Sequence, residues 1–323
     1  MRARMARCFV TGGAGFIGSH LADHLLAAGH DVTGFDNFST GFHEFLEGAR
    51  ACPRFRLVEG DLLESDAVAR AMAGVDFVFH MAANADVRFG PLHPRKDLEQ
   101  NTIATSNVLE AMRASGARRI AFASTGSVYG EPEVFPTPET APFPVQTSFY
   151  AASKLAAEGL ISAYSAAYGF QGWIFRFVSI LGERYTHGHV LDFYQQLIEH
   201  PDRLDVLGNG RQRKSYLYVH DCISAMLLAV EKAAHPVNIF NLGTDEYCEV
   251  NDSIRWISEH LGVSPRLSYA GGVRGWAGDS PFIFLDCGRM RALGWRPEVT
   301  IRDGIIRTLE FLAGNRWLLG KRP

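Results

Sequence analysis

The sequence contains few cysteines, and they are far apart. Five occur among 323 residues, and none forms a Cys-x-x-Cys pair. This spacing excludes a zinc ribbon and a disulfide framework as the basis of the fold. No apolar run is long enough to span a bilayer, and the basic opening residues lack the apolar core of a signal peptide. We therefore expect a cytoplasmic protein.

An excess of one charge is also missing. The net charge is −3 and the isoelectric point is about 6.5, which gives no indication of nucleic-acid binding. Hydrophobic residues make up 47% of the chain and charged residues 21%, as is typical of a soluble globular protein. A chain of 323 residues is long enough to fill a large core and to divide into two domains.

Short apolar runs alternate with helical patterns in the first half of the chain. The expected strands are residues 8–11, 32–35, 55–58, 77–81, 119–123 and 173–177. The expected helices are residues 15–28, 65–73, 98–115 and 150–168. This alternation predicts an α/β fold whose Rossmann-type, doubly wound parallel sheet is covered by helices on both faces.

A glycine-rich turn stands between the first strand and the first helix. In CFVTGGAGFIGSHL, the glycines Gly12, Gly15 and Gly18 have the spacing GxxGxxG. Gly12 permits the tight turn, Gly15 lets the backbone approach a pyrophosphate, and Gly18 lets the helix pack closely on the strand. The start of the helix then supplies free N–H groups to an anion. We interpret this segment as a dinucleotide-binding loop.

Two carboxylates follow at the ends of the next strands. Asp36 lies eighteen residues after Gly18, where an acid accepts hydrogen bonds from an adenosine ribose. It repels a 2′-phosphate, and residues 37–39 include no arginine, so NAD is favoured over NADP. Asp61 is placed either to meet the adenine or to cap a helix, and both readings stay open.

The second half of the chain has a looser pattern, with turn signals at LGNGRQ and AGGVRGWAGD. We expect residues 1–178 to form the NAD-binding domain. Residues 179–214 and 244–323 form a smaller α/β substrate-binding domain that closes over the ligand. The segments SYLYVHD and VNIFNLGT resemble strands, and we expect residues 215–243 to return to the main sheet.

The stretch FYAASKLAAEG places Tyr150 and Lys154 four residues apart, on one face of a helix. A free tyrosine is a poor base at neutral pH. A nearby ammonium favours the phenolate and lowers its pKa into the useful range. The upstream strand ends in Ser124 and Thr125, whose hydroxyls can hold a substrate oxygen near the phenol. These residues together predict general acid–base chemistry beside a dinucleotide.

The motifs TGGAGFIG, HMAANADV, STGSVYG and YAASK, in this order, resemble the extended short-chain dehydrogenase/reductase family, and within it the nucleotide-sugar epimerases. The resemblance extends from about residue 7 to residue 297. It implies that Thr125, Tyr150 and Lys154 are catalytic. It also implies a set of cofactor-binding residues: Gly12, Gly15, Phe16, Ile17, Gly18, Asp36, Asn37, Asp61, Leu62, Ala82, Ala83, Asn101, Ser124, Tyr150 and Lys154.

In the 4-epimerases of this family the tyrosine removes a proton from a sugar hydroxyl and the C4 hydride passes to NAD. The 4-keto sugar then turns about its pyrophosphate and takes the hydride back on its other face. The resemblance therefore implies an isomerase that epimerises C4 of UDP-glucose or UDP-galactose. The implied substrate-binding residues are Val87, Thr125, Gly126, Ser127, Tyr150, Ser179, His189, Val190, Arg213, Lys214, Arg274 and Asp279.

Within this set the pyrophosphate anchor is open between two neighbours. Lys214 stands where most family members carry arginine, and Arg213 is beside it. Arg274 and Asp279 resemble a further phosphate-binding element of the family. Ser179 replaces a common asparagine, which leaves the nucleotide and the sugar open. Trp276 either faces the sugar or simply packs.

Other readings are weighed against epimerisation. Family dehydratases follow the threonine with Asp-Glu, whereas this chain has Gly126 and Ser127, which disfavours elimination. A UDP-glucuronate or UDP-N-acetylhexosamine 4-epimerase, an epimerase at another position, a reductase, a decarboxylase and a steroid-type dehydrogenase stay open on this fold. A non-catalytic NAD-sensing protein would not need Tyr150 and Lys154.

No metal is expected, because His187 and His189 have no third ligand in the sequence. His80, within an apolar run, is interpreted as a core histidine. Residues 98–115 and 150–168 are apolar on more than one face. In this family such helices pair across a two-fold axis, so we expect a homodimer.

Overall fold

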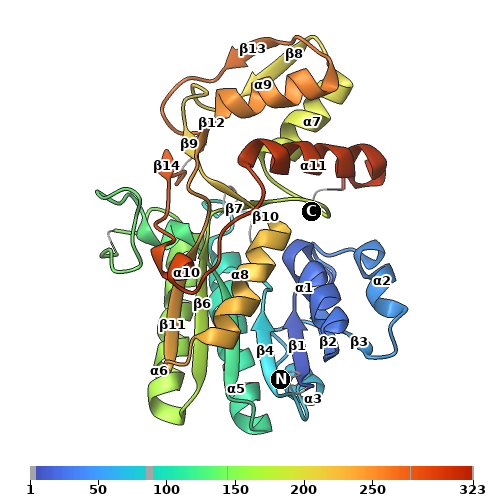
Figure 1. Ribbon diagram of the computed structural model, residues 1–323, viewed down its shortest axis with the longest axis vertical. Helices are drawn as coiled ribbons and strands as arrows, with labels where there is room; N and C mark the ends of the chain where they lie inside the picture. The colour runs from blue at the N-terminus through green and yellow to red at the C-terminus, as the bar shows by residue number, and fades with distance from the viewer. Residues whose placement is uncertain (1–4, 85–89, 144, 277, 322–323) are drawn as a thin grey trace.

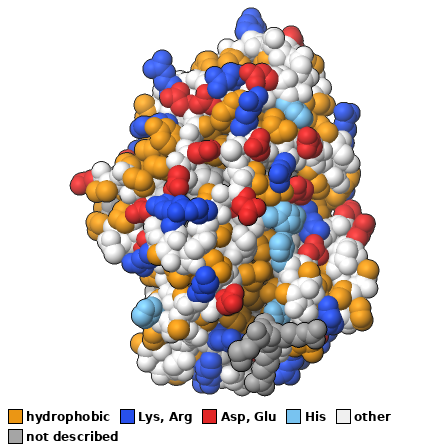
Figure 2. Space-filling view, in the orientation of Figure 1, with side chains coloured by type: hydrophobic (Ala, Val, Ile, Leu, Met, Phe, Trp, Pro, Cys, Tyr) orange, Lys and Arg blue, Asp and Glu red, His pale blue; other side chains and the backbone are white. Residues whose placement is uncertain are grey.

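The computed structural model describes residues 5–84, 90–143, 145–276 and 278–321. Figure 1 shows a large sheet with its helices in the lower part of the view and a smaller set of helices and short strands above it. On the face drawn in Figure 2, Lys and Arg side chains are interspersed with Asp and Glu side chains. No described helix is long and apolar enough to cross a membrane.

The sheet has seven parallel strands in the order β11-β6-β5-β4-β1-β2-β3. Because the chain moves outward from β1 in both directions, the sheet is doubly wound, and the predicted fold class is confirmed. The strands are β1 (Arg7–Thr11), β2 (Asp31–Asp36), β3 (Phe55–Glu59), β4 (Phe77–His80), β5 (Arg119–Thr125), β6 (Gln171–Phe177) and β11 (Val237–Leu242).

Both faces of the sheet are buried, which explains why its central strands are apolar throughout. In β4, Phe77 and Phe79 belong to one hydrophobic cluster and Val78 belongs to the other. Neighbouring side chains of a strand point to opposite faces, so each face needs its own apolar cover. The run FVFH is therefore fully buried.

Helices α1 (Phe16–Ala27) and α8 (Val219–Lys232) cover one face of the sheet and lie side by side in Figure 1. The other face is covered by α3 (Ser65–Ala71), α5 (Ala104–Ser115) and α6 (Phe149–Tyr168). The helix expected over residues 98–115 is divided, because its first part, Leu98–Ile103, is a π-helical turn. Such turns widen the backbone locally and are frequent beside functional sites.

Of the two segments expected to return to the sheet, one does. VNIFNLGT contains β11, which pairs with β6 along its whole length. SYLYVHD contains β10 (Tyr216–Tyr218), which pairs instead with β7 (Ser179–Leu181) in a separate two-stranded sheet. One edge of β6 is paired with β5 and the other with β11. β10 therefore pairs with β7, which follows β6 in the chain. The domain boundaries themselves stay a prediction.

The upper part in Figure 1 is built from short elements of the second half. Its two small sheets pair β8 with β13 and order three strands as β12-β9-β14. Their bounds are β8 (Arg203–Val206), β9 (Arg213–Lys214), β12 (Cys248–Glu249), β13 (Arg266–Tyr269) and β14 (Phe282–Ile283). The helices beside them are α7 (His189–Glu199), α9 (Val250–Leu261) and α11 (Ile301–Gly314). The remaining helices are α2 (Glu47–Arg50), α4 (Pro94–Asp97) and α10 (Gly288–Ala292).

Candidate active site

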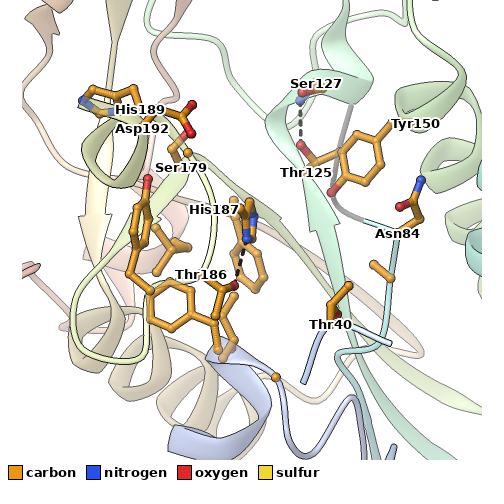
Figure 3. A pocket seen from close by; sticks show the side chains of 18 of the residues that line it. Thr40, Asn84, Thr125, Ser127, Tyr150, Ser179, Thr186, His187, His189 and Asp192 are labelled. Carbon is orange, nitrogen blue, oxygen red and sulfur yellow. Dashed lines mark hydrogen bonds between the residues drawn. The ribbon is translucent and has the colours of Figure 1, made fainter. Parts of the chain in front are cut away.

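A cavity of about 1150 Å³ lies at the carboxyl ends of the sheet strands, beneath the upper part of the molecule. Residues that follow β1, β4, β5 and β6 form one side of it, and residues of α7 and β9 form the other. Figure 3 shows Thr125 and Tyr150 on one side of the space and Ser179 and His187 on the other. Ligands of open parallel sheets bind at this edge.

The glycines of the loop have two roles: some allow the backbone conformation of the turn, and one leaves open space in the cavity. Gly12 has a φ of 65°, and its N–H donates to the Phe35 carbonyl at 2.9 Å. A Cβ on Gly18 would lie 2.0 Å from the Gly12 oxygen, so the chain itself requires these two glycines. A Cβ on Gly15 would meet a single atom, at 3.2 Å. Gly15 therefore keeps open the space above the α1 N-terminus, which has no side-chain cap.

This cradle fits a dinucleotide, because free helical N–H groups and open space suit a pyrophosphate. Four further residues of the predicted set line the cavity nearby: Phe16, Ile17, Ala82 and Ala83. Leu62 and Asn37 line it at the end of the next strands. The dinucleotide loop predicted from the sequence thus has the geometry that NAD needs.

Asp36 lines the same cavity but is already engaged. Its carboxylate accepts hydrogen bonds from the Ala14 N–H at 2.9 Å and from the Phe38 N–H at 2.8 Å. Burial raises the pKa of Asp36 above its usual value, and these backbone donors oppose the rise. The carboxylate is therefore held in a fixed position at the cavity wall, as recognition of a ribose requires.

Asp61 does not line the cavity. It accepts hydrogen bonds from Asn37 Nδ2 at 3.0 Å and from the Leu63 N–H at 2.9 Å. The N-cap position of helix α3 is Glu64, whose side chain makes no capping hydrogen bond, so the reading of Asp61 as the helix N-cap is wrong. In this structure Asp61 orients Asn37, which does reach the cavity.

His80 is enclosed in a chain of hydrogen bonds below the cavity wall. Its Nδ1 lies 2.7 Å from Thr11 Oγ1, and its Nε2 lies 2.9 Å from Thr105 Oγ1. Thr105 donates its own proton to the Asn101 carbonyl, so the imidazole donates from Nε2 and accepts at Nδ1. Burial lowers the pKa of His80 to about 3. The prediction of a core histidine is confirmed.

Asn101 lies behind the cavity wall instead of lining it. Its Oδ1 accepts from the Asn84 N–H at 2.9 Å, and its Nδ2 donates to Ser153 at 2.9 Å. Asn84 is the residue that reaches the cavity; its Nδ2 donates to Asp97 at 2.8 Å. The sequence reading missed Asn84, although the motif HMAANADV contains it.

Thr125 and Tyr150 meet at the cavity, as expected. Thr125 ends β5, and its hydroxyl accepts from the Ser127 N–H at 3.1 Å (Figure 3). Burial raises the pKa of Tyr150 to about 12, and a hydrogen bond with Thr125 opposes that rise. The phenol and the threonine hydroxyl therefore form one hydrogen-bonded pair at the cavity.

Lys154 is placed differently from the expectation. Its Nζ donates to the Ala123 carbonyl at 2.8 Å and lies 4.7 Å from the centre of the Phe122 ring. The side chain is buried and does not line the cavity. Burial lowers the pKa of Lys154 to about 7. Burial and the charge of Asp97 raise the pKa of Tyr150, and the hydrogen bond with Thr125 lowers it. The Lys154 side chain is directed to the end of β5 instead.

A buried ion pair lies behind the start of α6 and the end of β5. Arg176 donates to Glu158 at 2.7 Å and 3.1 Å, and both side chains are less than 5% exposed. Ser124, which lines the cavity, donates to the same carboxylate. Arg176 also donates to the Tyr129 hydroxyl at 2.8 Å. This network fixes the end of β5, and no sequence motif we used indicated it.

The predicted substrate residues divide into two groups. Those that line the cavity are Thr125, Ser127, Tyr150, Ser179, His189, Lys214 and Asp279. Those that do not are Gly126, Val190, Arg213 and Arg274. Val87 lies outside the described residues. Gly126 packs near Leu285, and the Val190 side chain belongs to the hydrophobic core.

The choice between Arg213 and Lys214 follows from the pairing of β9, whose two residues point to opposite faces. The Arg213 guanidinium lies 4.1 Å from the centre of the Phe282 ring, away from the cavity. Lys214 reaches the cavity, where its Nζ donates to Asp279 Oδ1 at 2.6 Å and to the Ser280 carbonyl. Arg274 is paired with Glu131 at 2.5 Å and also donates to the Asp279 carbonyl.

Trp276 lines the cavity beside Lys214, which favours the reading that it faces the ligand. Gln212 also lines the cavity and was not singled out from the sequence. His187 and His189 both reach it, at different places along the wall (Figure 3). Among the residues that the structure describes, no group of three or more His, Cys, Asp or Glu side chains is arranged to hold a metal ion.

The comparisons with known proteins agree with this geometry. Residues 8–243 match the family described as NAD dependent epimerase/dehydratase family. A UDP-glucose 4-epimerase of Mycolicibacterium smegmatis is 32% identical over 94% of this chain and 98% of its own. The crystal structure of the Thermus thermophilus UDP-glucose 4-epimerase in complex with NAD has a TM-score of 0.85 at 33% identity, over 95% of this chain and 99% of that chain.

A relative with a different reaction is also similar. UDP-glucuronic acid decarboxylase 1 of Xenopus tropicalis is 31% identical over 98% of this chain and 76% of its own. Similarity over almost the whole chain therefore does not by itself separate the two reactions.

Proposed function

The chain belongs to the NAD-dependent epimerase/dehydratase family, and from this premise we propose that it is an NAD-dependent nucleotide-sugar 4-epimerase, with UDP-glucose and UDP-galactose as its substrates. The observation that carries the proposal is the Thr125–Tyr150 pair, which meets at the cavity beside the glycine loop. The similarity to UDP-glucose 4-epimerases along nearly the full chain supports the choice of reaction.

The residues of the chain have separate tasks in this reaction. The glycine loop, Asp36 and Asn37 line the cavity and would hold NAD, which would supply reversible hydride transfer when bound. The Tyr150 phenol, in hydrogen bond with Thr125, exchanges a proton with the sugar hydroxyl. Ser127 lines the same part of the cavity, whereas the Ser124 hydroxyl donates to Glu158 behind it. Lys214 and Asp279 stand at the other end, where the nucleotide is anchored.

Epimerisation requires one firmly held end and one end that can turn. The cavity of about 1150 Å³ is large enough for a dinucleotide and a nucleotide sugar together. The sugar end is lined by small hydroxyl side chains, of Thr125, Ser127 and Ser179. Small side chains leave room for the intermediate to turn about its diphosphate before the hydride returns.

Dehydration is disfavoured at this site. The residues after Thr125 are Gly126 and Ser127, so no acid stands there to protonate a leaving hydroxyl. A Cβ on Gly126 would lie 3.1 Å from Leu285, and Gly126 does not line the cavity. Loss of water would therefore lack a positioned proton donor.

A second candidate acts on UDP-glucuronate, as a 4-epimerase or a decarboxylase. The similarity to UDP-glucuronic acid decarboxylase 1 favours it. Oxidation at C4 is common to both reactions. In the decarboxylase, the C5 carboxylate of the 4-keto sugar then leaves as carbon dioxide, a proton takes its place at C5, and the hydride returns to C4. The C4 isomer of UDP-glucuronate, or carbon dioxide released from UDP-glucuronate, with no C4 isomer of UDP-glucose, would select this candidate.

The experiment is an incubation of the purified protein with UDP-galactose, with no NAD added. We expect UDP-glucose to form, because the cofactor is regenerated in each cycle and need not be supplied. The Tyr150→Phe variant should lose nearly all turnover while it retains NAD. Tyr247→Phe, at an exposed tyrosine, is the matched control and should keep full activity. Bound cofactor without any C4 isomer would reject the proposal.

We also propose that the protein acts in the cytoplasm as a homodimer. The apolar side chains of Leu98, Ile103, Phe149 and Tyr168 are 40–51% exposed on the helices expected to pair. A second copy of the chain would cover them. Sedimentation as a monomer at micromolar concentration would contradict the dimer.

A further inference from the structure

Three buried polar atoms at the nucleotide end of the cavity have no hydrogen-bond partner within the described chain. They are His189 Nε2, Gln212 Oε1 and Trp276 Nε1, and all three residues line the cavity. A buried polar group without a partner is costly. Such groups around one space indicate a polar ligand; Gln212 Oε1 can only accept, so it needs a donor of that ligand other than a phosphate.

The charges at this end of the cavity are nearly balanced. Lys214 faces the cavity, but its ammonium is 2.6 Å from the Asp279 carboxylate, so the pair carries no net charge. Arg213 stacks on Phe282, and Arg274 is paired with Glu131. No arginine among the described residues lines the cavity. A dianionic ligand must therefore find further hydrogen-bond donors at this end.

Trp276 is the side chain that can supply one. Its indole N–H can only donate, as can the Lys214 ammonium. The Lys214 Nζ lies over the Trp276 ring, 5.9 Å from its centre, and both residues line the cavity. Two donors near one another favour an anionic acceptor with several lone pairs, and phosphate oxygens are such acceptors.

His189 stands near the same ammonium and is kept neutral. Its Nδ1 lies 3.3 Å from the Tyr216 hydroxyl. Burial and the charge of Lys214 lower the pKa of His189 to about 4. In the tautomer in which Tyr216 donates to Nδ1, Nε2 carries the proton and is a second neutral donor on the cavity wall.

We propose that Trp276 is a substrate-binding residue whose indole N–H donates to the diphosphate of the nucleotide sugar, together with Lys214. The inference rests on the proposed function and adds a specific contact to it. It distinguishes this site from one that holds the diphosphate with guanidinium groups alone. Under this proposal, residues other than Trp276 bind the base and the ribose of the nucleotide.

The test compares Trp276→Phe, which keeps an aromatic ring but removes the N–H, with the wild-type holoenzyme. Trp256→Phe is the matched control, because Trp256 is also half-buried but belongs to α9 and does not line the cavity. The probes are UDP and uridine. We expect the Kd for UDP to rise about tenfold in Trp276→Phe only, as for one lost hydrogen bond to a charged group. The Kd for uridine should stay the same in all three proteins.

A second measurement uses wild-type protein with ¹⁵N-labelled tryptophan, so that it does not depend on the folding of a variant. The indole resonance that is absent from Trp276→Phe should move downfield on addition of UDP and stay in place with uridine. An unmoved resonance, or an unchanged Kd for UDP in Trp276→Phe, would overturn the inference while the wild type still epimerises UDP-galactose. A wild type that binds no UDP would overturn the proposed function as well.

Discussion

The phenol of Tyr150 is the side chain whose protonation matters most for the proposed reaction. Burial raises its pKa to about 12, and a hydrogen bond with Thr125 opposes this rise. Lys154 donates to the Ala123 carbonyl instead. Before any ligand contact is counted, the threonine is therefore the residue that makes the tyrosine a better base.

Replacement of Thr125 by valine tests this role. Thr125→Val keeps the shape of the side chain but removes the hydrogen bond, so the pKa of Tyr150 should rise further. We expect kcat to fall by about 10²–10⁴, the usual contribution of a positioned proton-transfer group, with little change in KM. The alkaline shift of the pH–rate profile is the measurement that checks it. Thr125→Ser, which keeps the hydroxyl, should retain most of the activity.

At this scale the sequence predicted the reacting pair but not the neighbours that tune it. Tyr150 and Thr125 belong to short motifs, so their meeting could be anticipated. The direction of Lys154 depends on the buried carbonyl of Ala123, which no local pattern reveals. The same holds for Arg213 and Lys214, because the strand pairing of β9 decides which of them faces the cavity.

The turn between β1 and α1 shows how one element serves two purposes. Gly18 is required by the chain, since a Cβ there would lie 2.0 Å from the Gly12 oxygen. A Cβ on Gly15 would lie 3.2 Å from the Gly12 oxygen and would otherwise point into the open space of the cavity. Within one glycine pattern, Gly18 is therefore needed for folding and Gly15 for binding.

This difference predicts two distinct phenotypes. Gly15→Val should fold but lose most of its bound NAD, because the added side chain fills the space above the helix N-terminus. Gly18→Ala should lower the free energy of unfolding by several kcal/mol, since overpacking against backbone typically costs about 1–3 kcal/mol or more. Urea denaturation and the absorbance of released NAD measure the two effects separately. A Gly15→Val protein that purifies with a full complement of NAD would contradict the assignment.

The elements of the sheet were predicted well because each leaves a local signature. The strands β1 to β6 are apolar runs, and each lies within two residues of its expected bounds. The π-helical turn at Leu98–Ile103 was not expected, because its sequence continues the ordinary helical pattern. The placement of β10 was missed because the partner of a three-residue strand is decided by which sheet edge is free.

Histidine burial makes the whole molecule sensitive to acid. His20 and His80 are both buried, and burial lowers the pKa of each to about 3. His20 lies 2.9 Å from the Glu183 carbonyl, where α1 meets the chain that leads to α7. Histidine side chains gather between the two parts of the molecule in Figure 2. Protonation of these groups would therefore loosen both the sheet and the contact of the upper part.

The sign of the effect follows from the direction of the shift. A histidine whose pKa is depressed in the folded state stabilises the fold above its unfolded pKa of about 6.5, and this stability is lost as the pH falls toward 3. His189, whose pKa burial lowers to about 4, responds in the same way, so for the three groups we expect the free energy of unfolding to drop by about 3–4 kcal/mol between pH 6 and pH 5. Urea denaturation at the two pH values measures it. His20→Asn should show about two thirds of the drop, whereas His200→Gln, at an exposed histidine, should match the wild type.

The return of β11 to the edge of the main sheet has a consequence for how this molecule can change. The chain leaves the sheet after β6, contributes to the upper part, comes back as α8 and β11, and leaves again. The upper part is therefore not one continuous block of sequence, and it cannot be exchanged for that of another protein by a single end-to-end fusion. A new sugar preference must therefore arise through individual substitutions in the pocket. The main sheet must tolerate each of them, because the same stretch of chain contributes to both the sheet and the pocket.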